Sequence, residues 1–325
     1  MRAVLFLALL MSQFSIAVAG QNVTSENVRE WLSRVSSVGK TLNYEGTFIY
    51  RHGNKMEAIR VIHKADEKGE HERLVSLTGV AREIIRNNDQ VTCILPKNRS
   101  VVVDNVGPET KLPTFPSDLA NIEGYYDFVF EGYERVASRQ ARRVLIRPKD
   151  SLRYGYRVWI DDAFELLLRS ELLDTGGNVV EQIMFTSIKL HQTIDEALLK
   201  PNISGREYKW VTDDEKRSDD PMAVDASWQA NDLPKGFMKS HHNMQKLPDN
   251  KMPVEHLVFT DGLAWVSVYI EKLDKQKQLL DGTSNMGAVN AFGRIVGDYQ
   301  ITAVGEVPEA TVQLLGRSIE HIRIQ

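Results

Sequence analysis

A long succession of short apolar segments without intervening helical patterns is the feature that most constrains the fold of this chain. Between residues 44 and 185 apolar side chains recur mostly at every second position, and turn-prone stretches separate the segments. Residues 174–178, Asp-Thr-Gly-Gly-Asn, form the clearest hairpin signal. The expected strands are Tyr44–Tyr50, Ile59–His63, Leu74–Leu77, Ile84–Ile85, Val91–Leu95, Tyr125–Phe130, Val144–Arg147, Tyr154–Ile160, Leu166–Leu172 and Val179–Phe185.

This succession shows no alternation of strands with helices, which excludes a Rossmann-type sheet. It favours an α+β fold whose large domain is a closed or strongly curved antiparallel sheet. We expect a curved antiparallel β half-barrel. A helix is expected to begin after Thr24 or Ser25, either of which can cap it, and to end at Gly39. It has one apolar face, with which it can cover the concave side of the sheet. A second short helix is expected from Thr193 to Lys200, where Pro201 stops it.

The first nineteen residues are typical of a cleavable secretory signal. Arg2 precedes the apolar run Val4–Met11, and Ala17–Ala19 supplies a small-residue cleavage site. Ser12 interrupts the run too early for a membrane-spanning helix, which needs about 20 apolar residues. No Cys lies at the predicted cleavage site, so the acceptor of a lipoprotein anchor is missing. We therefore expect a soluble exported protein.

The roughly 300 residues that remain favour two domains. We expect residues 20–203 to form the half-barrel domain, residues 204–226 an exposed acidic linker, and residues 227–325 a smaller α+β domain. In the smaller domain, strands are expected at His256–Phe259, Ala264–Ile270 and Tyr299–Val304, and a final helix from Pro308 to His321.

Charge and cysteine content narrow the classes of partner. The net charge of −4 gives no basic surface for nucleic acid. The single Cys93 cannot form a disulfide within the chain. Because Cys93 lies on the same strand face as Val91 and Leu95, we expect a buried core thiol. A disulfide to another molecule is the alternative.

Motifs for catalysis are missing from the sequence. The eight histidines form no common metal-binding spacing, and no Gly-x-Ser-x-Gly nucleophile turn occurs. His241 and His242 are expected in a polar loop, and the glycine-bearing stretch Gly282–Gly287 is expected as a flexible β-loop and not as a phosphate-binding loop. We therefore predict a protein that is not an enzyme and needs no cofactor or metal.

Aromatic and arginine residues gather on the later strands, a composition typical of recognition surfaces and also of ordinary sheet cores. If they form a surface, an apolar concave face would suit lipid or peptide. The candidate binding residues of the large domain are Tyr125, Tyr126, Arg153, Tyr154, Tyr156 and Trp159.

Several longer motifs, in the same order along the whole mature chain, resemble the RseB/MucB family of periplasmic regulators of the sigma-E envelope-stress response. They are residues 44–53 (YEGTFIYRHG), 72–74 (ERL), 82–86 (REIIR), 153–161 (RYGYRVWID), 172–174 (LLD), 233–237 (LPKGF), 253–263 (PVEHLVFTDGL) and 304–308 (VGEVP).

The resemblance implies a periplasmic protein whose large domain is similar to the LolA/LolB lipoprotein carriers. It implies binding to the periplasmic part of a transmembrane anti-sigma factor, protection of that factor from site-1 proteolysis, and release when a lipid or lipopolysaccharide-type ligand is sensed. In the small domain it points to Phe237, Asp261 and Gly262 as partner-binding candidates. Some relatives carry a second Cys where this chain has residues 135–141, so a disulfide with Cys93 is not expected.

Our hypothesis from the sequence is steric protection with ligand-controlled release. The anti-sigma segment would occupy the smaller domain and the cleft between domains, and lipid in the large domain would favour another domain arrangement. A periplasmic lipid or lipoprotein carrier is the alternative, and an exported hydrolase is a third. The family also makes a homo-oligomer plausible.

Overall fold

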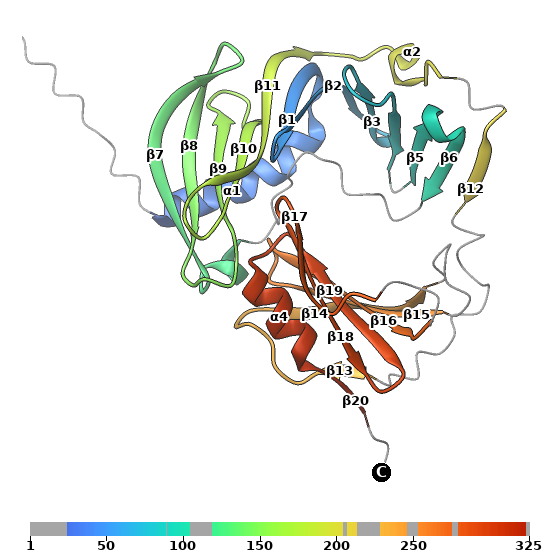
Figure 1. Cartoon of the computed structure of the whole chain (residues 1–325). Coiled ribbons are helices and arrows are strands. Elements are labelled where there is room, and N and C mark those ends of the chain that lie inside the picture. The colour runs from blue at the N-terminus through green and yellow to red at the C-terminus, as the bar shows by residue number, and fades with distance from the viewer. Residues whose placement is uncertain are drawn as a thin grey trace, which may run out of the picture.

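A computed structural model of the 325-residue chain describes residues 25–88, 90–104, 119–203, 207–212, 228–245, 253–274 and 279–322 (Figure 1). The predicted signal segment, residues 1–19, lies outside the described residues, as does most of the predicted linker. The described chain forms a large, curved sheet and a separate smaller sheet (Figure 1). Both are strand-rich, with few helices, which confirms the predicted α+β class.

The large sheet has twelve strands in the order β12-β6-β5-β4-β3-β2-β1-β11-β10-β9-β8-β7. All neighbours are antiparallel except β12 and β6. Their bounds are β1 Asn43–His52, β2 Lys55–Asp66, β3 Gly69–Ser76, β4 Glu83–Asn87, β5 Gln90–Leu95, β6 Ser100–Asp104, β7 Tyr126–Val136, β8 Arg139–Pro148, β9 Gly155–Asp161, β10 Leu167–Leu173, β11 Val179–His191 and β12 Lys209–Thr212.

The sheet curves without closing, because β7 and β12 remain as its two edges. Bulges interrupt the register between Thr47 and Phe48 of β1 and between Phe130 and Gly132 of β7. Such bulges increase local twist and bend a strand. Gly46 is needed near the first bulge, because a Cβ there would lie 2.7 Å from the carbonyl oxygen of Ser187.

Helix α1 (Ser25–Val38) covers one end of the sheet, as its apolar spacing predicted. Trp31, Leu32 and Val35 are buried against β7, β8 and β9. We call the sheet face that α1 contacts the inner face and the opposite one the outer face. Beyond α1 and η1 (Gly39–Thr41), the inner face carries an apolar cluster around Phe48 and Phe185. The other members of that cluster are Tyr44, Ile59, Val61, Leu74, Leu166 and Ile183.

The predicted short helix near residue 196 is present as α2 (Glu196–Leu199), which Asp195 caps through a hydrogen bond from the amide of Ala197. A buried ion pair holds this region against the outer face. Arg73 and Glu83 lie 2.9 Å apart, and Arg73 also donates to the carbonyl oxygen of Leu198. Glu83 in turn accepts from the amide of Asn202.

The segment predicted as a linker contains a strand. Residues 209–212 form β12, which pairs in parallel with β6, while Trp210 stays half-exposed at the sheet edge. The sequence could not indicate this strand, because its ladder partner lies about a hundred residues earlier. The other residues of 204–226, apart from Glu207 and Tyr208, lie outside the described part of the chain.

The small domain is a six-stranded sheet in the order β14-β15-β16-β19-β18-β17, with α4 (Glu309–Ser318) packed on β18 and β19. Its strands are β14 Met238–Gln245, β15 Val254–Thr260, β16 Trp265–Lys272, β17 Gly282–Met286, β18 Val289–Val296 and β19 Tyr299–Gly305. A separate pair is formed by β13 (Trp228–Ala230) and β20 (Ile319–His321).

Three expectations about the small domain are wrong. The last helix ends at Ser318, because Ile319 is buried and residues 319–321 pair with β13. His241 and His242 lie in β14, not in a loop, because they pair with β15. Residues 282–286 form the edge strand β17 against β18. Only residues 319–321 have a partner distant in sequence, whereas β14 and β17 each pair with the next strand along the chain.

His256, on β15, gives the small domain a specific pH dependence. Its ring stacks on Tyr269 with centroids 4.4 Å apart, and burial, with the nearby charge of His241, lowers its pKa to about 4. The unfolded chain protonates this imidazole near pH 6.5. The unfolded state therefore binds more protons between pH 6.5 and 4, so the free energy of unfolding decreases as pH falls through this window.

We predict that His256→Phe, which keeps the stack on Tyr269, removes this part of the acid sensitivity. The wild type should lose on the order of 2 kcal/mol more than the variant between pH 7 and pH 4. Urea unfolding of the small domain at several pH values measures the difference. Parallel pH profiles for the two proteins would contradict the prediction.

Candidate functional site

Most of the sequence-predicted binding residues meet at one place, the contact between the two domains. Arg153, in the β8–β9 connection, is fully buried and forms an ion pair with Asp261 at 3.0 Å. Tyr126 donates a hydrogen bond to the same carboxylate at 2.9 Å. Arg153 also donates to the carbonyl oxygen of Lys235 in the small domain. The two domains therefore share one buried, charged contact, which we call the domain lock.

Aromatic rings enclose the guanidinium of this lock. Its carbon lies 5.0 Å from the ring centre of Tyr125, 5.6 Å from that of Tyr126 and 5.3 Å from that of Phe237. A cation over an aromatic face is attracted to the ring, and more strongly where water is excluded. Burial and the charge of Asp261 raise the pKa of Tyr126, so its hydroxyl remains a donor.

Local turns set the positions of the small-domain residues. Asp261 follows β15, and its Oδ1 accepts from the amides of Leu263 and Ala264, which leaves Oδ2 for the large domain. Gly262 has a φ of +103°, a backbone conformation that glycine adopts without a steric penalty. Gly236 has a φ of +89°, and Tyr125 packs directly against it. A Cβ at position 236 would lie 2.3 Å from the Tyr125 ring, so a residue with a side chain would clash there.

A second set of contacts extends the interface along α4 and β18. Asn290 donates to the hydroxyl of Tyr154 and to the carbonyl oxygen of Val307. Thr311, in the first turn of α4, donates to the carbonyl oxygen of Leu152. At the β17–β18 turn, a Cβ on Gly287 would lie 2.2 Å from the ring of His52, so the small domain also reaches the β1–β2 hairpin (Figure 1).

The remaining two candidates of the large domain, Tyr156 and Trp159, are not part of the lock and lie on opposite faces of the sheet. Tyr156 is half-buried on the inner face, next to the lock. Trp159 points to the outer face, where its indole nitrogen donates to Glu134 and Arg169 lies over its ring at 4.0 Å. These two residues are separated by an odd number of positions, and alternating strand residues point to opposite faces. The six large-domain candidates therefore cannot form one surface.

Trp159 borders a polar hollow of about 390 Å³ on the outer face. Three arginines and three glutamates line it and pair with one another, so no excess charge remains for a ligand. The charged members are Glu131, Glu134, Arg143, Arg157, Arg169 and Glu171.

Cys93 on β5 is only half-buried, which differs from the expected core thiol. Val91 is buried, but Cys93 lies near the sheet edge, where few elements cover it. Partial burial raises the pKa of the thiol, so the reactive thiolate is disfavoured.

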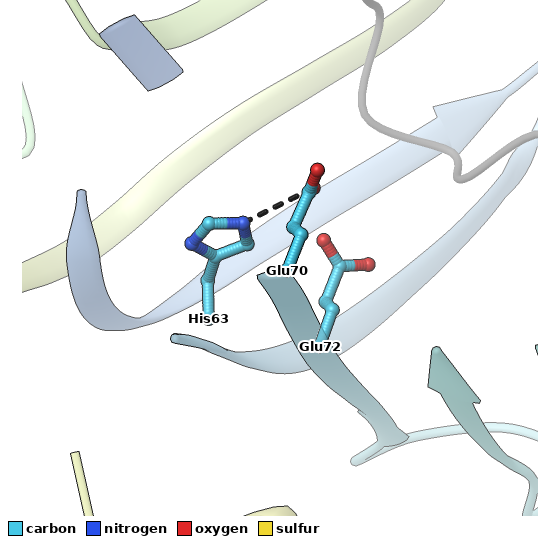
Figure 2. A group of neighbouring side chains, drawn as sticks. All are labelled: His63, Glu70 and Glu72. Atoms are coloured by element: carbon cyan, nitrogen blue, oxygen red, sulfur yellow. Dashed lines mark hydrogen bonds and ion pairs between the residues drawn. The ribbon is translucent and has the colours of Figure 1, made fainter. Parts of the chain in front are cut away.

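A group that sequence reasoning missed lies on the inner face of the β2–β3 hairpin. His63, Glu70 and Glu72 place one ligand-type atom each within 4.8 Å of one another (Figure 2). The spacing matches no common metal motif, because the two glutamates reach His63 only across the hairpin. The signal that could have found them is the turn at Glu67–Gly69, which places Glu72 directly opposite His63.

The fold and the domain lock define a two-domain, strand-rich protein whose two sheets meet through one buried, charged contact. The chain belongs to the MucB/RseB family: its N-terminal domain model matches residues 27–203 and its C-terminal domain model matches residues 222–320. None of the helices in the described part of the chain combines the length and apolar character that a membrane crossing needs.

Named relatives support the same assignment. The chain is 28% identical over 295 residues to the sigma factor AlgU regulatory protein MucB of Pseudomonas aeruginosa, covering 89% of this chain and 90% of the relative. It is 25% identical over 294 residues to the sigma-E factor regulatory protein RseB of Escherichia coli K12, covering 89% of each chain.

Solved structures extend the likeness to the fold. The P. aeruginosa MucA/MucB complex contains a chain with TM-score 0.73 and 26% identity, covering 92% of this chain and 100% of that one. MucB crystallised alone gives a TM-score of 0.65 at 26% identity, covering 92% of this chain and 99% of that one.

We predict that Asp261→Asn opens the domain lock. Asparagine can still accept from the amides of the turn, but it removes the fully buried partner of Arg153 and leaves only the partly exposed Asp150, whose Oδ1 lies 3.3 Å from Nε of Arg153. We expect a loss of about 3 kcal/mol, the lower end of the cost of breaking a buried ion pair. Small-angle scattering should show a larger radius of gyration, and urea unfolding a lower midpoint. The matched control is Asp127→Asn, which removes an exposed partner of Arg147 and should change stability by less than about 1 kcal/mol. Equal effects of the two variants would contradict the role of the lock.

Proposed function

We propose that this chain binds the periplasmic part of a membrane-spanning anti-sigma factor and so acts as a negative regulator of a sigma-E-type factor. The observation that carries the proposal is family membership across both domains, together with the likeness to MucB solved in complex with MucA. The sequence of this chain offers no catalytic motif, and its described contacts favour noncovalent binding.

The domain lock gives this proposal a physical basis. A partner that contacts both domains binds only while their arrangement is maintained, and the Arg153–Asp261 pair stabilises one arrangement. A second ligand can weaken partner binding only if it prefers a different arrangement. The interface around Phe237 and Asp261 therefore acts by holding the domains together, and the partner would contact exposed surface beside it.

The finer steps follow from the family resemblance. The bound anti-sigma segment would be sterically shielded from site-1 proteolysis in the periplasm. A lipid-bearing envelope molecule would trigger release by contacting the apolar inner face of the large sheet. The curved sheet, which does not close, supports this step, but the cluster around Phe48 and Phe185 is buried, so lipid would have to displace or open the packing of the inner face.

The first test is calorimetric binding of the mature protein to the periplasmic segment of the cognate anti-sigma factor, with and without a lipid A-type ligand. We expect binding that lipid weakens. Asp261→Asn should weaken binding by about tenfold, or 1.4 kcal/mol, because the locked arrangement is less populated. Asp127→Asn serves as the control. No binding to the segment would overturn the proposal.

Protection from cleavage is a separate prediction. The purified site-1 protease should cut the anti-sigma segment more slowly when the mature protein is present, and lipid should restore the rate. A segment with a scrambled binding region provides the control for direct inhibition of the protease. If cleavage is equally fast with and without the protein, binding does not protect.

A periplasmic lipid or lipoprotein carrier is the second candidate, because a curved sheet that does not close could serve it. A carrier needs no anti-sigma partner. Lipid binding without any binding to the segment, together with transfer of a lipoprotein between membranes in vitro, would favour this function instead.

A further inference from the structure

The strongest unassigned feature is the group of His63, Glu70 and Glu72 on the inner face of the β2–β3 hairpin (Figure 2). His63 and Glu72 are cross-strand partners in the hairpin register, and Glu70 lies two positions before Glu72 on β3, so it shares the same face. His63 is 2% exposed and Glu72 is 5% exposed, whereas the Glu70 side chain remains 30% exposed. The group is thus buried on one side and open on the other.

The imidazole of His63 is oriented as a metal-ligating histidine usually is. Its Nδ1 lies 2.7 Å from the carbonyl oxygen of Leu42, which can only accept, so Nδ1 carries the proton. Its Nε2 points toward Glu70 at 3.2 Å. Metal-bound histidines characteristically donate their other ring N–H to a carbonyl or carboxylate, which fixes the ring. The ring of Tyr44, stacked at 4.8 Å, adds a second restraint.

Glu72 supplies the second, independent observation. Its Oε1 is buried and has no hydrogen-bond partner among the described residues. Figure 2 shows its carboxylate directed toward the same space as that of Glu70. A buried carboxylate oxygen without a donor is destabilising. A bound cation would satisfy it without any movement of the main chain.

Two positively charged side chains, Arg86 and Lys40, also act on the glutamates of this group. Arg86 lies opposite Glu72 on β4, and its charge acts on both glutamates; Lys40 acts on Glu70. Burial raises the pKa of Glu72, and the charge of His63 opposes this shift. Burial lowers the pKa of His63. The hydrogen bonds to Glu70 and Leu42, together with the charges of the two glutamates, raise it by more, so the pKa of His63 is raised overall. Without a metal, the hydrogen bond between Nε2 and Glu70 spans the space that the cation would occupy.

We propose that His63 Nε2 and the carboxylates of Glu70 and Glu72 form a three-ligand site for a divalent transition metal of the Zn²⁺ class. One imidazole with two carboxylates suits Zn²⁺ better than Mg²⁺ or Ca²⁺, which prefer oxygen alone. The exposed side of Glu70 leaves a fourth position for water. When the metal binds, Nε2 releases its proton to solvent and forms the metal–nitrogen bond.

A metal here would link β2 and β3 to the chain after α1, because Leu42 holds the imidazole from the segment that joins α1 to β1. It would stiffen the inner face beside the apolar cluster. This site is independent of the anti-sigma partner, so the two proposals can fail separately.

The test is titration of the mature, chelator-treated protein with ZnCl₂, followed by calorimetry, and with CoCl₂, followed by visible absorption. We expect one metal per chain. His63→Gln and the near-isosteric Glu72→Gln should each weaken binding by at least about tenfold, the loss typical even of outer-sphere partners. His71→Gln is the matched control, because His71 lies on the same hairpin but has the opposite strand parity.

Two results would overturn the site. One is zinc binding that both His63→Gln and Glu72→Gln leave unchanged, which would mean surface binding only. The other comes from the wild type alone, so it remains informative if the variants fail to fold. If ¹⁵N resonances of the His63 ring stay those of an imidazolium at saturating Zn²⁺, the group is a proton-bridged ion pair and not a metal site.

Discussion

The relative placement of the two domains depends on one buried ion pair, that of Arg153 and Asp261. Both side chains are fully buried, and a buried charge that loses its partner is destabilising. Arg153 has a second carboxylate partner, the partly exposed Asp150, within the large domain. Tyr126, the carbonyl oxygen of Lys235 and three aromatic rings complete the environment of the pair. The curved sheet and the small sheet each have their own core, but the surface they present together exists only while this contact is made.

Local patterns predicted the parts of the fold that local interactions determine. The apolar face of α1 and the hairpin at residues 174–178 are both present where the sequence placed them. Two of the errors fall where a distant partner decides the structure. Residues 319–321 continue a helical pattern, yet β13 draws them into a strand, and residues 209–212 gain their strand from β6.

The candidate site shows the same division. Composition identified Arg153 and Tyr126, and the family resemblance pointed to Asp261. Neither could indicate that these residues lie buried between domains, because that depends on which surface the second domain covers. The parity of Tyr156 and Trp159 was readable from the sequence and separates them, as the structure shows. The group at His63 required the register of the β2–β3 hairpin, which a spacing rule along the chain does not contain.

Asp261 serves two structures with its two oxygens. Oδ1 shapes the β15–β16 turn, and Oδ2 meets Tyr126 and Arg153 in the other domain. A hairpin that paired one residue out of register would turn its side chains to the wrong face. The carboxylate would then miss its partners. Docking of the two domains therefore depends on correct folding of the smaller one. A small domain with a misfolded β15–β16 hairpin could not form the contact with the large domain.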